Sequence, residues 1–117
     1  MRLALLFFIP YLSLGSSFVP ELKDVKINDT TISVSKNCKK NCLAIENFKK
    51  LDRELFKSIE KTIFGGRTAG DQVCREGFKA EVKYYRDKDQ NEYHYCFFKD
   101  SSYLDVDNYE MKIDSFK

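Results

Sequence analysis

The chain has a single histidine, no block of like charge and, after residue 17, no long apolar run. Its 20 basic and 18 acidic residues leave a formal net charge of +2, which provides no strong field to attract nucleic acid. No segment after residue 17 is long and apolar enough to cross a bilayer. The sequence therefore predicts a protein that binds no nucleic acid and has no stable membrane insertion in its mature form.

The long apolar run that the chain does have stands at its start. Arg2 precedes an apolar stretch over 3–14, and small residues follow directly. This order is typical of a secretory signal peptide. The sequence predicts a signal peptide over 1–17, cleaved before Phe18 or two residues earlier, and one small exported domain, periplasmic or extracellular, over 18–117. No cysteine lies near either cut, so we expect no lipoprotein anchor.

The clearest periodicity predicts one helix over 41–64, where apolar residues recur every three or four positions. Two segments rich in aromatic and β-branched residues, 78–86 and 92–99, predict a β-hairpin. We therefore expect a disulfide-stapled α+β domain in which one long helix packs on an antiparallel sheet of three to five strands.

The flanking segments give weaker patterns. Residues 18–36 predict either a short hairpin or a single broken strand. A short helical segment is expected over 68–75, and a third strand over 103–107. The tail after residue 108 fits either an edge strand or a short helix.

The register of the 78–99 hairpin decides which side chains share a face of the sheet. If Tyr85 lies opposite Tyr93, then Val82 lies opposite Cys96 and one face is largely apolar, whereas a shift by one residue would mix charge into it. We expect this apolar face to contact the helix. Its other members are Phe78, Ala80, Tyr84, His94 and Phe98.

The opposite face of the hairpin is aromatic and basic, and it is the predicted binding face. Its residues are Tyr85, Tyr93, Tyr95, Phe97, Lys79 and Lys83. Clustered aromatic side chains of this kind are typical of interfaces. The alternative is that the N-terminal hairpin or the C-terminal tail covers this face.

The four cysteines of an exported chain are expected to form disulfides. Cys96 falls on the apolar face, and Cys74 precedes the hairpin in a segment able to fold back over that face, so we favour Cys74–Cys96. Cys38 and Cys42 are one helical turn apart and form the second pair. The alternative is a zinc site made by the cysteines with the lone histidine. Because export normally supplies oxidation, we predict no metal and no cofactor.

The segment from Gly65 to Tyr109 contains a cysteine, a glycine, a strand, an acidic loop and a second strand that ends in Cys-x-Phe-x-Asp-x-Ser. This order resembles a small exported bacterial domain of unknown function, often labelled as a hemolysin. The residues that carry the resemblance are Ala69, Cys74, Gly77, Cys96, Phe98, Asp100 and Ser102. The resemblance implies an α+β fold and a Gram-negative periplasmic or secreted location, and it implies no established activity.

The residues available for catalysis are few. His94 is a lone histidine on a strand, with no nucleophile beside it in sequence, and the acidic residues fall mainly in polar loops. We therefore predict that the chain is no enzyme and binds an unidentified protein or envelope component. The alternatives are a cystatin-like protease inhibitor, although its Gln-x-Val-x-Gly motif is absent, and a small secreted hydrolase or toxin.

Overall fold

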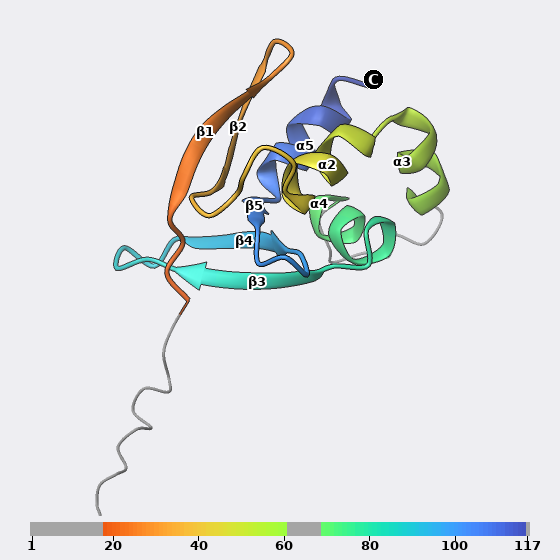
Figure 1. The fold of residues 1–117 in the computed structure, drawn as a ribbon. Helices are drawn as coiled ribbons and strands as arrows, with labels where there is room; N and C mark the ends of the chain where they lie inside the picture. The colour runs from red at the N-terminus through yellow and green to blue at the C-terminus, as the bar shows by residue number, and fades with distance from the viewer. Residues whose placement is uncertain (1–17, 61–68, 117) are drawn as a thin grey trace, which may run out of the picture.

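The computed structural model describes residues 18–60 and 69–116, which form one sheet and a group of short helices (Figure 1). The strands are β1 (Leu22–Ile27), β2 (Thr30–Ser35), β3 (Glu81–Arg86), β4 (Glu92–Phe97) and β5 (Tyr103–Asp105). The helical elements are α2 (Leu43–Lys50), α3 (Arg53–Glu60), α4 (Ala69–Gln72), the π-helical turn η2 (Val73–Gly77) and α5 (Asp107–Asp114). The predicted signal peptide over 1–17 and the predicted helix end at 61–64 lie outside the described residues.

The strands form one antiparallel sheet in the order β1-β2-β5-β4-β3. A two-residue turn joins β1 to β2, and its Asn28 has φ 56°, a left-handed conformation that asparagine tolerates. Residues 18–36 therefore form a hairpin and not a broken strand. The tail forms the helix α5. The α+β class with an antiparallel sheet is confirmed, and β1 and β3 are its two edges.

The prediction of one long helix over 41–64 is wrong, because the structure has two eight-residue helices, α2 and α3. The chain extends at Leu51, with φ −70° and ψ 112°, and the Leu51 side chain is buried. Asp52 then caps α3, since its carboxylate accepts a hydrogen bond from the Leu55 N–H at 2.8 Å. A helical spacing of apolar residues survives such a break when each short helix buries its own stripe.

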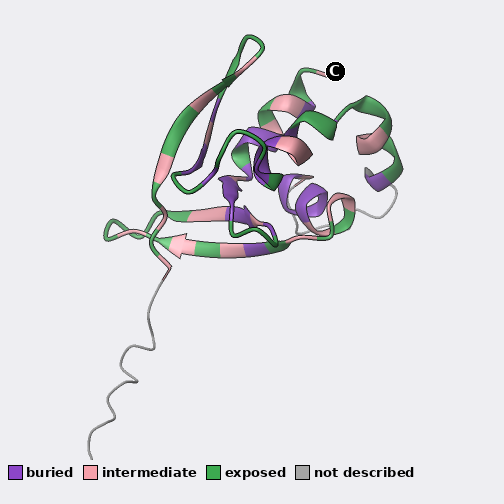
Figure 2. Cartoon of the chain, viewed as in Figure 1, coloured by how far each residue is buried: buried purple, intermediate pink, exposed green. Residues whose placement is uncertain are grey.

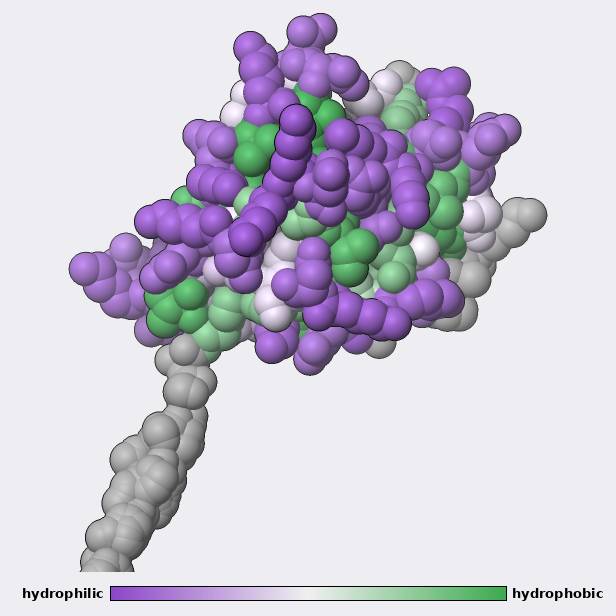
Figure 3. Space-filling model, viewed as in Figure 1, coloured by the Kyte–Doolittle hydropathy of each residue, from purple (hydrophilic) through white to green (hydrophobic). Residues whose placement is uncertain are grey.

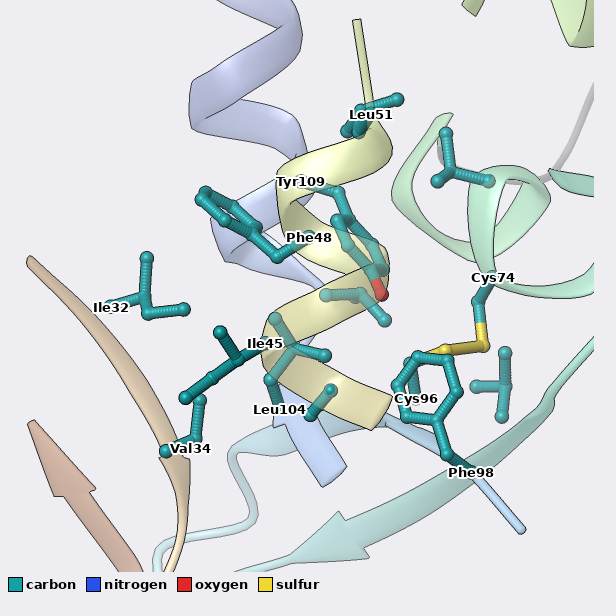
Figure 4. Close-up of a cluster of buried hydrophobic side chains, with 14 of the residues drawn as sticks. Ile32, Val34, Ile45, Phe48, Leu51, Cys74, Cys96, Phe98, Leu104 and Tyr109 are labelled. Carbon is teal, nitrogen blue, oxygen red and sulfur yellow. A yellow bond between two sulfur atoms is a disulfide. The ribbon is translucent and has the colours of Figure 1, made fainter. Parts of the chain in front are cut away.

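The sheet buries one row of side chains across four strands. The row consists of Val34, Leu104, Cys96 and Val82, which are paired neighbours on β2, β5, β4 and β3. Each is at most 7% exposed. Helix α2 crosses this region and brings Ile45 and Phe48 into the same core, where Leu51, the residue after the helix, and Tyr109 of α5 also lie (Figure 4). The helices thus cover one face of the sheet, as predicted, although α3 packs mainly against η2.

The predicted apolar face of the β3–β4 hairpin is only partly buried: Val82, Cys96 and Phe98 are buried, whereas Tyr84 is exposed. The pairs Val82–Cys96, Tyr84–His94 and Tyr85–Tyr93 confirm the predicted register. Tyr84, however, is 49% exposed, and its hydroxyl accepts a hydrogen bond from Arg75 at 2.8 Å. The expectation that Tyr84 contacts the long helix is therefore wrong, because its ring packs against His94 and its hydroxyl binds Arg75 of η2 instead.

The disulfides join Cys38 to Cys42 and Cys74 to Cys96, the two pairs favoured from the sequence. The Cα atoms are 5.3 Å and 5.7 Å apart, respectively. The Cys74–Cys96 bridge ties η2 to the middle of the sheet and is completely buried. In the chain-entropy model the short 38–42 loop is worth about 2 kcal/mol and the longer 74–96 loop about 3 kcal/mol.

The loop between β4 and β5 caps the N-terminus of α2. The Leu43 N–H donates to Asp100 Oδ2 at 2.9 Å, and the Ala44 N–H donates to Ser102 Oγ at 3.0 Å. Ser102 Oγ in turn donates to Asp100 Oδ1 at 2.5 Å. Partial burial acts to raise the pKa of Asp100, but these hydrogen bonds outweigh burial and lower it. Asp100 and Ser102 of the Cys-x-Phe-x-Asp-x-Ser order therefore have a structural role as helix caps.

Candidate functional site

The aromatic face is the sheet surface turned away from the helices. Strand alternation places alternate residues of β3, β4 and β5 on it, in the paired rows Glu81–Phe97–Tyr103, Lys83–Tyr95–Asp105 and Tyr85–Tyr93. Glu81 and Asp105 are the acidic side chains of these rows. We define the aromatic face as Lys83, Tyr85, Tyr93, Tyr95, Phe97 and Tyr103. The structure thus brings five of the six predicted binding residues together on two adjacent strands.

The inner part of the aromatic face is covered by the start of the described chain. The Phe18 ring packs edge-on against Tyr95, Phe97 and Tyr103, with centroids 5.6, 4.9 and 5.2 Å away. The Tyr103 hydroxyl accepts a hydrogen bond from the Glu21 N–H at 2.9 Å and so holds this segment across the sheet. Tyr95 is only 3% exposed. The alternative of an N-terminal cover is therefore correct for this part of the face.

The outer part of the aromatic face remains half-buried and open to a partner. Tyr85 and Tyr93 stack across the two strands with ring centroids 6.2 Å apart. The Tyr93 hydroxyl donates to Asp87 Oδ2 at 3.3 Å. Lys83 Nζ lies 4.4 Å from the centroid of the Phe97 ring, within range of a cation–π interaction. Tyr85 and Tyr93 thus form a small aromatic platform beside Lys83, and Glu81 and Asp105 place negative charge on the same face of the sheet.

Lys79 lies beside this platform and not on it. It precedes β3 and has φ 54°, so it does not follow the strand alternation that the sequence pattern assumed. Its side chain nevertheless lines an open groove of about 540 Å³ together with Lys83 and Phe97. The predicted site therefore has two connected parts, a platform on β3 and β4 and a basic groove at the start of β3.

Two tyrosine hydroxyls of the aromatic face, those of Tyr93 and Tyr95, are held in the protonated form. Burial raises the pKa of Tyr95 to about 12, and the nearby charge of Asp105 adds to the effect. The charge of Asp87 raises the pKa of Tyr93. Both hydroxyls are therefore hydrogen-bond donors at neutral pH, and neither is activated as a nucleophile.

His94 lies on the other face of the sheet, where it links β4 to α4. Its Nδ1 atom is 3.0 Å from Asp71 Oδ2 and 3.1 Å from Asp71 Oδ1. Its Nε2 atom is 3.9 Å from Glu92 Oε1, and the Tyr84 ring packs against it at 4.6 Å. A histidine–aspartate pair orients an imidazole, but acyl transfer also needs a hydroxyl or thiol at the second nitrogen. The contacts of His94 fit a structural link, and the partner Asp71 was not recognised from the sequence.

The four cysteines are all in disulfides, so they offer no thiolates for the alternative zinc site. Over residues 18–60 and 69–116, the structure contains no group of three or more histidine, cysteine or acidic side chains able to hold a metal. Within the same ranges, no helix is long and apolar enough to span a bilayer.

The chain has no significant match to any protein-family model, to any curated protein or to any solved structure. The site must therefore be interpreted from its own geometry.

The sequence pattern missed two residues of this site: Tyr103, which lies on the aromatic face, and Phe18, which packs over it. Tyr103 belonged to a predicted strand, but its neighbour in the sheet was not known. Phe18 directly follows the predicted signal peptide, and nothing in its spacing links it to β4.

Proposed function

We propose that this chain is an exported, disulfide-stapled protein that binds a partner protein or envelope component and catalyses no reaction. The observation that carries the proposal is the platform of Tyr85 and Tyr93 on the outer part of the aromatic face, with Lys83 beside it. Tyrosine and phenylalanine are enriched at protein interfaces, because they bury a large area at a small cost in side-chain entropy.

The position of the platform supports binding at the sheet surface. β3 is an edge of the described sheet, so one side of its backbone has no neighbouring strand there. Figure 2 shows that β3 is exposed or half-buried along most of its length, with Val82 as its one buried residue. A partner can therefore contact the tyrosines and the edge together. The adjoining basic groove, with three lysines and one glutamate among its lining residues, adds attraction for a partner with negative charge.

Export is supported by the signal-peptide pattern at 1–17 and by two disulfides, which persist in oxidising compartments. The resemblance of Gly65–Tyr109 to a small exported bacterial domain agrees with this location. The alternatives have less support. A cystatin-like inhibitor would have a long helix on the sheet, whereas α2 has eight residues. A hydrolase would need a nucleophile beside the His94–Asp71 pair.

The test is photo-cross-linking from the sheet surface in the cells that export the protein. We expect benzoyl-phenylalanine in place of Tyr93 to yield one discrete cross-linked species. The same group in place of Tyr84 should yield none, because Tyr84 is exposed on the opposite face. The Lys83→Gln variant should weaken the cross-link from position 93. Equal cross-linking from both positions, or cross-linking from position 84 alone, would contradict the proposed binding face.

A further inference from the structure

A second surface, at the other edge of the sheet, is unexplained by the proposed function. An open groove of about 670 Å³ runs between β1, the 38–42 loop and α2. Five lysines line it, Lys23, Lys26, Lys39, Lys40 and Lys49. Its apolar part comes from Val25 and Ile27 of β1 and from Ile45 of α2. We call this surface the lysine groove.

The charge of the lysine groove is one-sided. No aspartate or glutamate is among its lining residues, although the whole chain has nearly equal numbers of basic and acidic residues. None of the five ammonium groups forms an ion pair with a carboxylate in the described ranges. Clustered unpaired ammonium groups repel one another, so the arrangement favours a bound anion.

The Cys38–Cys42 disulfide contributes to the shape of the groove. It closes a loop of very few residues, so it restricts the unfolded chain less than the Cys74–Cys96 bridge does. The residues between its cysteines include Lys39 and Lys40. Lys23 Nζ donates a hydrogen bond to the Cys38 carbonyl at 2.6 Å, which fixes β1 against the same loop. The bridge therefore positions two lysines opposite the edge strand.

We propose that the lysine groove binds an acidic peptide in an extended conformation, paired along β1. β1 is the outer strand of the described sheet and is mostly exposed or half-buried (Figure 2). An added strand obtains backbone hydrogen bonds from such an edge and specificity from alternate side chains. Val25 and Ile27 are two residues apart, which matches the spacing of side chains on one face of a strand. The lysines would pair with the acidic residues of the peptide.

The character of the surface favours a peptide over an acyl lipid. All five lysines are exposed, and Val25 and Ile27 are only half-buried. On the face shown in Figure 3, apolar patches are small and are separated by hydrophilic side chains. An acyl chain in this groove would remain largely in contact with water and would gain little from burial. Lysine ammonium groups on flexible stems suit several separate carboxylates.

The test measures binding of a fluorescent, acetylated and amidated peptide of alternating glutamate and valine to the purified exported protein. Two control peptides replace every glutamate by glutamine or every valine by proline; the second keeps the charge but loses strand pairing. The groove variant K26Q/K40Q/K49Q is compared with K36Q/K57Q/K88Q, which removes the same charge from exposed lysines that do not line the groove. Heparin is the probe for a general polyanion site, and oleate is the probe for an anionic lipid.

We expect the acidic peptide to bind with a salt-dependent affinity and to shift the amide resonances of β1. The groove variant should weaken binding by at least about tenfold and the control variant by less than about twofold. C38S/C42S should remain folded and bind several-fold more weakly. The proposal would be overturned by no binding at about 1 mM peptide, by equal binding of the glutamine or proline peptide, or by tighter binding of heparin or oleate at the same lysines. A groove variant that self-associates but still binds the peptide would show that the lysines only block edge pairing.

Discussion

Replacing Cys74 and Cys96 together by serine is expected to lower the free energy of unfolding by about 2–5 kcal/mol. Both side chains are completely buried in the core that Figure 4 shows, and the bridge joins η2 to the central row of the sheet. The double variant loses this cross-link and also buries two hydroxyl groups among apolar side chains. Urea denaturation under oxidising conditions, followed by far-ultraviolet circular dichroism, measures the change.

The matched control is the double replacement of Cys38 and Cys42 by serine. This bridge closes a shorter loop at the edge of the core, so its removal should cost less, about 2 kcal/mol or below. If both double variants lost the same stability, the Cys74–Cys96 bridge would not be the main staple of the domain. Unchanged stability of the Cys74→Ser/Cys96→Ser protein would contradict the pairing itself.

The second large effect is expected at Tyr95, where replacement by serine should destabilise the protein by about 3 kcal/mol. The ring is 3% exposed and packs against Phe18 and Tyr103. Its truncation leaves a cavity under the N-terminal segment. The same measurement of unfolding in urea, with Phe18 contacts monitored by proton NMR, reports the loss.

Tyr93→Ser is the matched control for Tyr95→Ser, because it removes the same ring two residues away on the same strand face. Its side chain is half-buried and contacts Tyr85 and Asp87 at the outer end of the sheet. We expect a loss below about 1 kcal/mol. A small effect at Tyr95 would mean that Phe18 does not cover the inner part of the aromatic face. A large effect at Tyr93 would mean that the platform is core and not a binding surface.

The sequence was most informative where one physical constraint admits few solutions. The β3–β4 register follows from the alternation that keeps Glu81 and Lys83 off the apolar face, and the structure has that register, although Lys79 precedes the strand. The Cys74–Cys96 pair followed from it, since Cys96 then faces the segment that contains Cys74, whereas Cys38–Cys42 followed from its four-residue spacing. These inferences needed only local spacing and the exclusion of charge from the core.

The sequence was least informative where contacts between distant segments decide the structure. The apolar stripe of 41–64 continues through the break at Leu51 and Asp52, because both short helices bury the same kind of side chain. The Phe18 contact with Tyr95 depends on where the hairpin enters the sheet. The lysine groove joins β1 to α2, two segments whose charges look evenly mixed along the chain. Local patterns contain none of this information.

The most direct test of the account is the intact mass and the non-reducing peptide map of the protein recovered from the exported fraction. The expected product is a chain without residues 1–17, or without residues 1–15 if cleavage occurs at the earlier site. It carries bridges at Cys38–Cys42 and Cys74–Cys96. Such a result would support export and fix the frame on which both binding surfaces rest. An uncleaved chain with four free thiols, or one with a bound metal, would contradict the central claim of an exported, disulfide-stapled domain.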